Sequence, residues 1–221
     1  MARIAVIGGS GRTGKLIVKA LAAQGDEVVA TIRNPRHMAE MARLGAIAVI
    51  IDLDTSPLAD FTIALGGADA VVFAAGSAAG ESSALDRKGM VRSIRAAKKA
   101  NVPLFLTIAS IGASTGMRLE GKWATDEMRD YYKQKRAGNK ALRESELNWI
   151  IVEPGELTDK KGTGKVELTT KPIEEGRIPR GDVAAVVVAL LAEPKAIGKA
   201  FQLVSGETAI AAAVKKAVGK K

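Results

Sequence analysis

The sequence predicts an α/β fold: a doubly wound, mostly parallel sheet with helices on both faces. Short runs rich in β-branched residues alternate with longer segments whose apolar residues recur at helical spacing. Several of these runs are apolar almost throughout, as strands buried on both faces of a parallel sheet are. A cluster of glycines between residues 8 and 14 stands at the first junction between a strand and a helix. In such a fold, ligands bind at the carboxyl ends of the strands.

The expected elements follow one another in strict alternation. Strands are expected at 3–8, 27–33, 46–51, 69–75, 103–109, 148–153 and 200–204. Helices are expected at 12–24, 36–44, 57–65, 82–100, 125–146, 181–192 and 208–218. Gly25 follows the first helix, where a left-handed residue commonly ends a helix. Ser82 or Ser83 is expected to cap the fourth helix, and Asp182 lies in the first turn of the sixth, at the positive end of the helix dipole.

One segment interrupts the alternation. Residues 156–181, "ELTDKKGTGKVELTTKPIEEGRIPRG", are polar and rich in glycine and proline. The segment is too long for an ordinary connection, so we expect a functional loop or a small hairpin over the site. The whole chain, 1–221, is expected to form one domain, with a small substrate-covering segment around 156–181.

Composition limits the kinds of function that the chain can have. It contains no cysteine, which excludes disulfides, thiolate zinc sites and thiol nucleophiles and agrees with a reducing cytosol. The net charge of +9 favours small anions, whereas an aromatic content of 4% and scattered basic residues do not favour nucleic acid. Neither a signal peptide nor an apolar run of about 20 residues is apparent. We expect a cytoplasmic protein, monomer or homodimer, that binds a small-molecule substrate, without nucleic acid, membrane or metal.

The glycine cluster fits two templates. Read as Gly9-x-x-x-x-Gly14-Lys15, it is nearly a P-loop for nucleoside triphosphates. A P-loop requires serine or threonine directly after the lysine, to coordinate Mg²⁺, and this sequence has Leu16 there. Leu16 is expected instead on the apolar helix face that packs on the sheet. That face would also include Ile17, Ala20 and Leu21.

Read as Gly8-x-x-Gly11-x-x-Gly14, the same cluster is a dinucleotide-binding turn, which makes the expected fold one of Rossmann type. Gly8 would allow the tight turn, Gly11 the approach of a pyrophosphate, and Gly14 the contact between helix and strand. The pyrophosphate would then lie on free amides at the helix N-terminus. The remaining residues of the turn are also expected to contact the cofactor: Ser10, Arg12 and Thr13.

The end of the second strand bears on the choice of cofactor. NAD-binding domains usually carry an acid there for the ribose hydroxyls, but this sequence reads "VVATIRNP" and offers Arg33. Arg33 and Arg12 could together bind the 2′-phosphate of NADP through charge-assisted hydrogen bonds. The alternative is that Arg33 is a solvated strand end. We favour NADP over NAD, and assign no role to His37, the single histidine.

These motifs together resemble the atypical NAD(P)H-binding branch of the short-chain dehydrogenase/reductase superfamily. The branch includes sugar-epimerase-like proteins, flavin or biliverdin reductases and NmrA-like sensors. "GGSGRTG", "IDLD", "VVFAAGS", "LDRKGMVRSIRAAKKANVPLFLTIASIGA", "NWIIVEPGELTD" and "GDVAAVVVALL" carry the resemblance nearly from end to end. It implies contacts with adenine and its ribose from Asp52, Leu53, Ala74, Ala75 and Gly76. It also implies contacts near nicotinamide from Pro154, Gly155 and Leu157.

The resemblance also implies a catalytic set of Ser110, Tyr131 and Lys135. Independently of any family, residues four apart lie on one helix face, and a nearby cation lowers the pKa of a phenol, making it a usable acid or base. Lys135 would also hold the nicotinamide ribose. The alternative pair Tyr132 and Arg136 lacks the lysine, and Tyr–Lys spacings of this kind are frequent on helices. Many relatives carry arginine at the position of Glu153.

The function expected from these observations is an NADP(H)-dependent oxidoreductase that transfers hydride to a small carbonyl, quinone-like or flavin-like acceptor. One alternative is a non-catalytic NADP(H)-binding redox sensor, which needs the same cofactor site. The other is a sugar-nucleotide epimerase, which needs a larger substrate lobe than the roughly 70 residues after the sixth strand provide.

Overall fold

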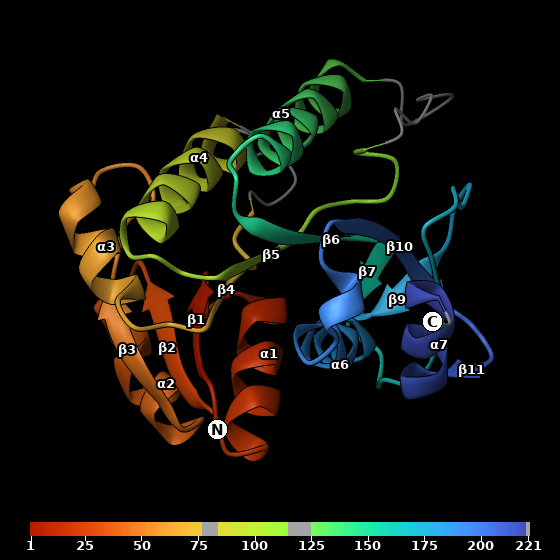
Figure 1. Ribbon diagram of the computed structural model, residues 1–221, viewed down its shortest axis with the longest axis horizontal. Helices are drawn as coiled ribbons and strands as arrows, with labels where there is room; N and C mark the ends of the chain where they lie inside the picture. Colours follow the sequence, from red (N-terminus) through yellow and green to blue (C-terminus); the bar gives the residue numbers. More distant parts are fainter. Residues whose placement is uncertain (77–83, 115–124, 220–221) are drawn as a thin grey trace.

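The computed structural model describes residues 1–76, 84–114 and 125–219, and its centre is a nine-stranded sheet (Figure 1). The strand order is β11-β8-β10-β6-β5-β4-β1-β2-β3. The strands are β1 (Arg3–Ile7), β2 (Glu27–Ile32), β3 (Ala46–Ile50), β4 (Ala70–Phe73), β5 (Leu104–Ile108), β6 (Asn148–Pro154), β8 (Lys165–Thr169), β10 (Lys199–Ser205) and β11 (Thr208–Ala209). From β3 to β10 all neighbours in this sheet are parallel, and β8 pairs antiparallel with both β10 and β11.

Helices cover both faces of this sheet. The helices are α1 (Arg12–Ala23), α2 (Met38–Arg43), α3 (Leu58–Leu65), α4 (Ala84–Lys99), α5 (Asp126–Arg143), α6 (Arg180–Leu191) and α7 (Ile210–Val218), with short 3-10 helices η1 (Pro35–His37) and η3 (Pro194–Ala196). Alternate residues of each strand serve different cores: Ile4 and Val6 pack with α1, α6 and α7, whereas Ala5 and Ile7 pack with α3, α4 and α5. The predicted doubly wound, mostly parallel α/β fold is therefore confirmed.

The helix boundaries follow local signals close to those expected. Gly25 has φ +92° and its amide donates to the carbonyl of Ala22, so it closes α1 as predicted. Thr125 caps α5, because its hydroxyl accepts from the amide of Met128 at 3.3 Å. The caps expected at Ser82 or Ser83 lie outside the described residues. Among the residues described, no helix combines the length and apolar character that crossing a membrane requires.

One predicted packing face is wrong. Leu16 was expected against the sheet, but 37% of it is exposed. The buried residues of α1 are Gly14, Ile17, Val18 and Leu21. The helix therefore faces the sheet along the row 14, 17, 18 and 21, and two steps of about 100° from Gly14 carry Leu16 to the outer side.

Residues 156–181 contain more regular structure than expected. β8 lies within this segment and extends the main sheet, while β7 (Glu156–Thr158) and β9 (Arg177–Pro179) pair in parallel as a separate small sheet. Alternation in "KVELT", with Val166 and Leu168 buried, was the sequence signal for β8. The segment is thus partly sheet edge and not a hairpin alone.

Asp182 fixes one end of this segment to α6. Its carboxylate is buried in the first turn of the helix, as predicted, and accepts hydrogen bonds from the amides of Thr163 and Gly164, both at 2.9 Å. These bonds hold the 162–164 turn against the N-terminus of α6, which leaves no room for a side chain on Gly162.

The junction of β1 and α1 is the tightest contact in the turn. A methyl group on Gly14 would lie 2.2 Å from the carbonyl oxygen of Gly8, and one on Gly11 would lie 3.2 Å from the same oxygen. The amide of Gly11 also donates to this oxygen at 3.0 Å. Close approach of backbone to backbone, rather than a positive φ, therefore requires glycine at position 14.

Replacing Gly14 with alanine is expected to lower the free energy of unfolding by at least about 2 kcal/mol, because backbone atoms block the added methyl group. Gly181 in α6 is the matched control, since a methyl group there would lie an ordinary 3.8 Å from the nitrogen of Gly162. Gly181→Ala should leave the stability unchanged or raise it by up to about 1 kcal/mol. Urea denaturation measures both, and equal stabilities of the two variants would contradict the assignment.

Candidate functional site

The strand order reverses between β1 and β4, and the candidate site lies at the carboxyl ends of these strands. Gly8 has φ +82°, and a side chain there would lie 2.8 Å from the backbone of Ala75, just after β4. The amide of Ala74 donates to the carbonyl of Ile7 at 2.9 Å. The predicted glycine turn and the predicted Ala74–Gly76 turn are thus in direct contact.

The N-terminus of α1 presents its amides at this edge. Gly11 is the N-cap residue, and in the described chain no side chain caps α1 and no acid occupies its first turn. Ser10 and Thr13 are half-buried, whereas Gly11 and Arg12 are exposed. Free amides and the positive end of the helix dipole make this turn suited to a phosphate group.

Lys15 does not point to a phosphate in the way a P-loop lysine does. Its Nζ lies 2.7 Å from Oε1 of Glu40 on α2, and Oε2 of the same carboxylate lies 3.2 Å from Nδ1 of His37. The bond with Lys15 is the main cause that lowers the pKa of Glu40. Lys15 and His37 therefore tie α1 to the η1–α2 region.

The two arginines expected at the adenosine phosphate have different surroundings. Arg33 is exposed directly after β2, beside Asn34, whose Oδ1 accepts from the amide of Arg36 at 3.0 Å and caps η1. Arg12 instead forms an ion pair with Asp159, at 3.1 Å, in the segment after β7. Arg12 is therefore directed to the side of the turn where the 156–181 segment passes.

Asp52 and Leu53 form the turn after β3. Oδ1 of Asp52 accepts from the amides of Asp54 at 2.8 Å and Thr55 at 3.3 Å, so this carboxylate shapes its own turn. Leu53 packs on Gly89 of α4. Arg92 of α4, which the sequence did not single out, donates to the carbonyl of Leu53 at 2.9 Å and holds the turn in place.

Lys135 reaches the end of β4 from α5. Its Nζ lies 2.9 Å from Oδ1 of Asp86 on α4, and 10% of the lysine side chain and none of the aspartate side chain are exposed. A methyl group on Gly76 would lie 3.2 Å from this Nζ. Asp86 was missed because α4 and α5 come together only in the fold. The nitrogen of Lys135 also lies 5.5 Å from the ring centre of Tyr131.

Ser110 follows β5, and its hydroxyl lies near enough to the phenol of Tyr132 to influence its pKa. Burial raises the pKa of Tyr132, and the nearness of Ser110 acts in the opposite direction. The rings of Tyr131 and Tyr132 meet edge to face, 5.4 Å between centres. The structure thus brings Ser110, from the loop after β5, near Tyr132 of α5, and Lys135 near Tyr131 on the same helix.

Glu153, at the end of β6, is buried in a polar network. Its Oε1 accepts from Nδ2 of Asn139 at 3.2 Å, and its Oε2 lies 3.5 Å from Nε2 of Gln202. Oε1 of Gln202 in turn accepts from the amide of Ile173, in the 156–181 segment. Burial raises the pKa of Glu153, and a bond with Ser114 offsets part of this effect.

The predicted turn after Glu153 closes the site. The carbonyl of Pro154 accepts from the amide of Ile111 at 2.9 Å, so this turn lies beside the Ser110 loop. A methyl group on Gly155 would lie 2.3 Å from the carbonyl oxygen of Gly176, which requires glycine for the close approach of the two chains. Leu157 is half-buried against the core that includes α1 and α6.

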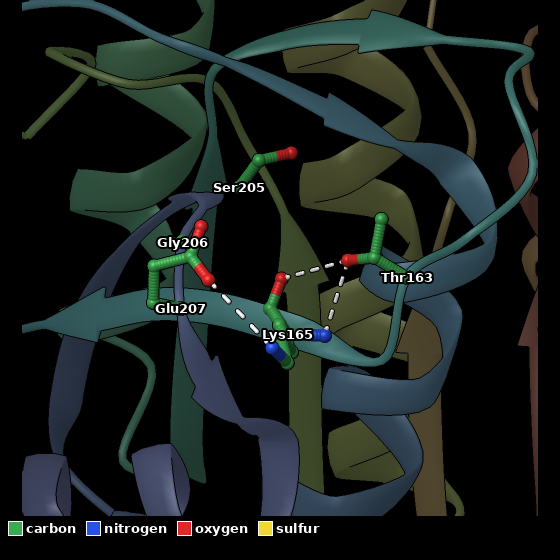
Figure 2. A pocket seen from close by; sticks show the side chains of 5 residues that line it. All are labelled: Thr163, Lys165, Ser205, Gly206 and Glu207. Carbon is green, nitrogen blue, oxygen red and sulfur yellow. Dashed lines mark hydrogen bonds and ion pairs between the residues drawn. The ribbon is translucent and has the colours of Figure 1, made fainter.

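A separate hollow of about 540 Å³ lies at the far edge of the sheet (Figure 2). It is lined by Thr163, Lys165, Ser205, Gly206 and Glu207, none of which is a predicted site residue. The hydroxyl of Thr163 is bonded to the backbone of Lys165, whose Nζ lies 3.7 Å from Glu207. In the strand order, β10, β6 and β5 separate β8 from β4, so we do not place the substrate there.

The geometry defines a dinucleotide-binding protein of the doubly wound α/β class, with a glycine turn, an uncapped helix and a hydroxyl cluster at one edge. Residues 8–194 match a family described as NAD(P)H-binding, and the chain belongs to that family. Membership of this family implies a nicotinamide cofactor but does not distinguish NADP from NAD. Among the residues described, no three acidic or histidine side chains gather in a way that would hold a metal ion.

Relatives of similar length support this assignment. An uncharacterized sugar epimerase of Bacillus subtilis is 32% identical over 97% of this chain and 99% of the relative. A Bacillus halodurans structure, provisionally assigned as an NAD-dependent epimerase/dehydratase, is 31% identical, with a TM-score of 0.87 over 98% of this chain and 100% of its own. An oxidoreductase of Lactococcus lactis is 28% identical, with a TM-score of 0.82 over 97% and 95%.

Glu153→Gln is expected to change how stability depends on pH. Because burial raises the folded-state pKa of Glu153, the folded chain binds this proton more tightly than the unfolded chain. The stability that comes from this bound proton is complete at pH values below 4.5, the ordinary pKa of glutamate, and is lost as the pH rises through the raised folded-state pKa. Glutamine cannot ionise, so the Tm of the variant minus the Tm of wild type should increase as the pH rises.

Thermal unfolding over a pH series measures this difference in Tm. Glu167→Gln, at an exposed position of β8, is the control and should show a difference from wild type that is independent of pH. A Glu153→Gln difference that stays constant across the series would show that Glu153 ionises as readily in the folded chain as in the unfolded one.

Proposed function

We propose that the chain is an NADP(H)-dependent oxidoreductase that transfers hydride between nicotinamide and a small carbonyl, quinone-like or flavin-like acceptor. The observation that carries the proposal is the contact of the Gly8 turn with Ala75, which joins the phosphate-binding turn to the β4 end beside Lys135. The NAD(P)H-binding family and the oxidoreductase relative support it. When bound, the nicotinamide gives or takes the hydride.

The residues present fit a dinucleotide. Gly8, Gly11 and Gly14 allow the close backbone contacts that form the turn, and the uncapped α1 amides would hold the diphosphate. Arg33 is exposed at the end of β2, where it would bind the 2′-phosphate of NADP through charge-assisted hydrogen bonds. Lys135, held by Asp86 beside Gly76, would bind ribose hydroxyls.

The hydroxyl groups of Ser110, Tyr131 and Tyr132 would donate or accept the proton that accompanies the hydride. Ser110 orients the acceptor oxygen, and a phenol beside it exchanges a proton with that oxygen. The nearness of Ser110 favours Tyr132 for this role, whereas the contact with Lys135 favours Tyr131. Because the acceptor must lie within reach of Ser110, we assign the proton to Tyr132 and leave Tyr131 as the neighbour that packs on it.

A non-catalytic redox sensor is the second candidate. Lys135 is paired with Asp86, and Ser110 lies near Tyr132, so the described contacts do not join Ser110 directly to Tyr131 and Lys135. A redox sensor would bind the cofactor tightly without turnover. An epimerase would use the same cofactor turn, in line with the names of two relatives, but would need room for a sugar nucleotide.

Arg33→Asp is expected to weaken NADPH binding by about 10- to 100-fold and NADH binding by less than about threefold, because only NADPH carries the 2′-phosphate. Titration calorimetry with both nucleotides measures this selectivity. Arg43→Asp makes the same charge change at an exposed position of α2 and should affect both nucleotides weakly. Equal losses for the two nucleotides in Arg33→Asp would show that another residue selects the cofactor.

Tyr132→Phe is expected to lower kcat by about 100-fold or more, because the proton donor beside Ser110 is lost. Loss of NADPH absorbance with a panel of quinones, flavins and aldehydes measures turnover. Tyr131→Phe is the matched control on the same helix and should retain kcat within about threefold. The opposite ranking would assign the proton to Tyr131 and Lys135, and tight NADPH binding by wild type without any turnover would support the sensor.

A further inference from the structure

Asp159 lies between two arginines that begin different helices. Its Oδ2 is 3.1 Å from NH1 of Arg12, the first residue of α1, and its Oδ1 is 2.7 Å from NH1 of Arg180, the first residue of α6. Two guanidinium groups thus share one carboxylate. Their combined charge remains positive at the edge of the sheet where the uncapped amides of α1 are presented.

The two ion pairs differ in their exposure to solvent. The side chains of Arg12 and Asp159 are 70% and 65% exposed, so their pair contributes little and is easily broken. Only 10% of the Arg180 side chain is exposed. A buried guanidinium requires an anionic partner, so Asp159 can leave Arg180 only when another anion takes its place.

A phosphate group satisfies this requirement better than a carboxylate. Its oxygens accept paired hydrogen bonds from guanidinium groups, and the neighbouring α1 amides supply further donors. We propose that Arg12 and Arg180 form an anion site for the diphosphate of the nicotinamide dinucleotide, and that Asp159 occupies this site from within the chain and competes with the ligand. The identity of the ligand rests on the proposed function; the site rests on the ion pairs.

The surrounding structure allows Asp159 to move without loss of the segment. The amides of Thr163 and Gly164 remain bonded to Asp182, and the amide of Glu156 donates to the carbonyl of Gly176 at 2.8 Å. These bonds hold the chain on both sides of Asp159. Displacement therefore concerns one side chain and its short connection, while the neighbouring backbone stays in place.

Asp159→Asn is expected to tighten binding of NADPH, NADH and inorganic pyrophosphate by about threefold to tenfold each, because a competing carboxylate is removed. Titration calorimetry with the full chain measures all three. Glu156→Gln is the matched control: it removes an exposed carboxylate three residues earlier, paired with Arg177 at 2.9 Å, and should change each affinity by less than about twofold.

Thermal unfolding supplies a readout that needs no turnover. Asp159→Asn leaves the buried Arg180 without its carboxylate, so without added anions the Tm of the variant should lie below that of wild type. Pyrophosphate should then raise the Tm of the variant by more than it raises the Tm of wild type. Arg180→Gln should weaken all three ligands by about tenfold, with circular dichroism to establish that the variant is folded.

Each result decides the proposal. Unchanged or weaker binding by Asp159→Asn overturns it, since Asp159 would then only orient the arginines. A gain for NADPH alone also overturns it, because Arg12 would then reach the 2′-phosphate. If wild type binds neither nucleotide but pyrophosphate binds more tightly to Asp159→Asn, the anion site stands and the proposed nucleotide function fails.

Discussion

The structure depends on one close approach, that of Gly14 to the carbonyl oxygen of Gly8. Because no side chain separates them, α1 begins directly on the end of β1, and its direction is set by backbone contact. The same turn brings Gly8 against Ala75, so the ends of β1 and β4 are aligned with each other. The glycine turn and the Ala74–Gly76 turn take their positions from these two strand ends.

A second close approach organises the opposite face. Gly138 of α5 leaves space for Met90 of α4, where a methyl group would lie 2.9 Å from the sulfur. The two helices therefore pack tightly, and the ion pair of Asp86 and Lys135 is buried between them. Such a pair favours a defined geometry more than it favours stability, because both charges lose their hydration. The position of Lys135 in the site thus depends on the small residue Gly138, which lets α5 approach α4 closely.

Local patterns predicted the seven helices and the strands β1–β6 and β10 in chain order, but not β7, β8, β9 and β11. They also predicted the glycine turn and the closing glycine of α1, since each depends on neighbouring residues. Contacts between distant segments were beyond such patterns: Asp159 with Arg12, and Asp86 with Lys135. The i, i+4 rule placed Lys135 near Tyr131. It could not show that the rotation of α5, set by buried Asn139 and Leu142, turns Tyr132 toward Ser110.

The attachment of Ile173 to the polar network of Glu153 leaves its side chain free to vary. Its backbone amide, not its side chain, donates to Gln202, which continues to Glu153. Any residue except proline supplies that donor, so the side chain at position 173 can vary while the 156–181 segment stays bonded to Gln202. The proposed substrate-covering segment can therefore differ in its side chain at this position while its backbone bond to Gln202, and through it the link to Glu153, is kept.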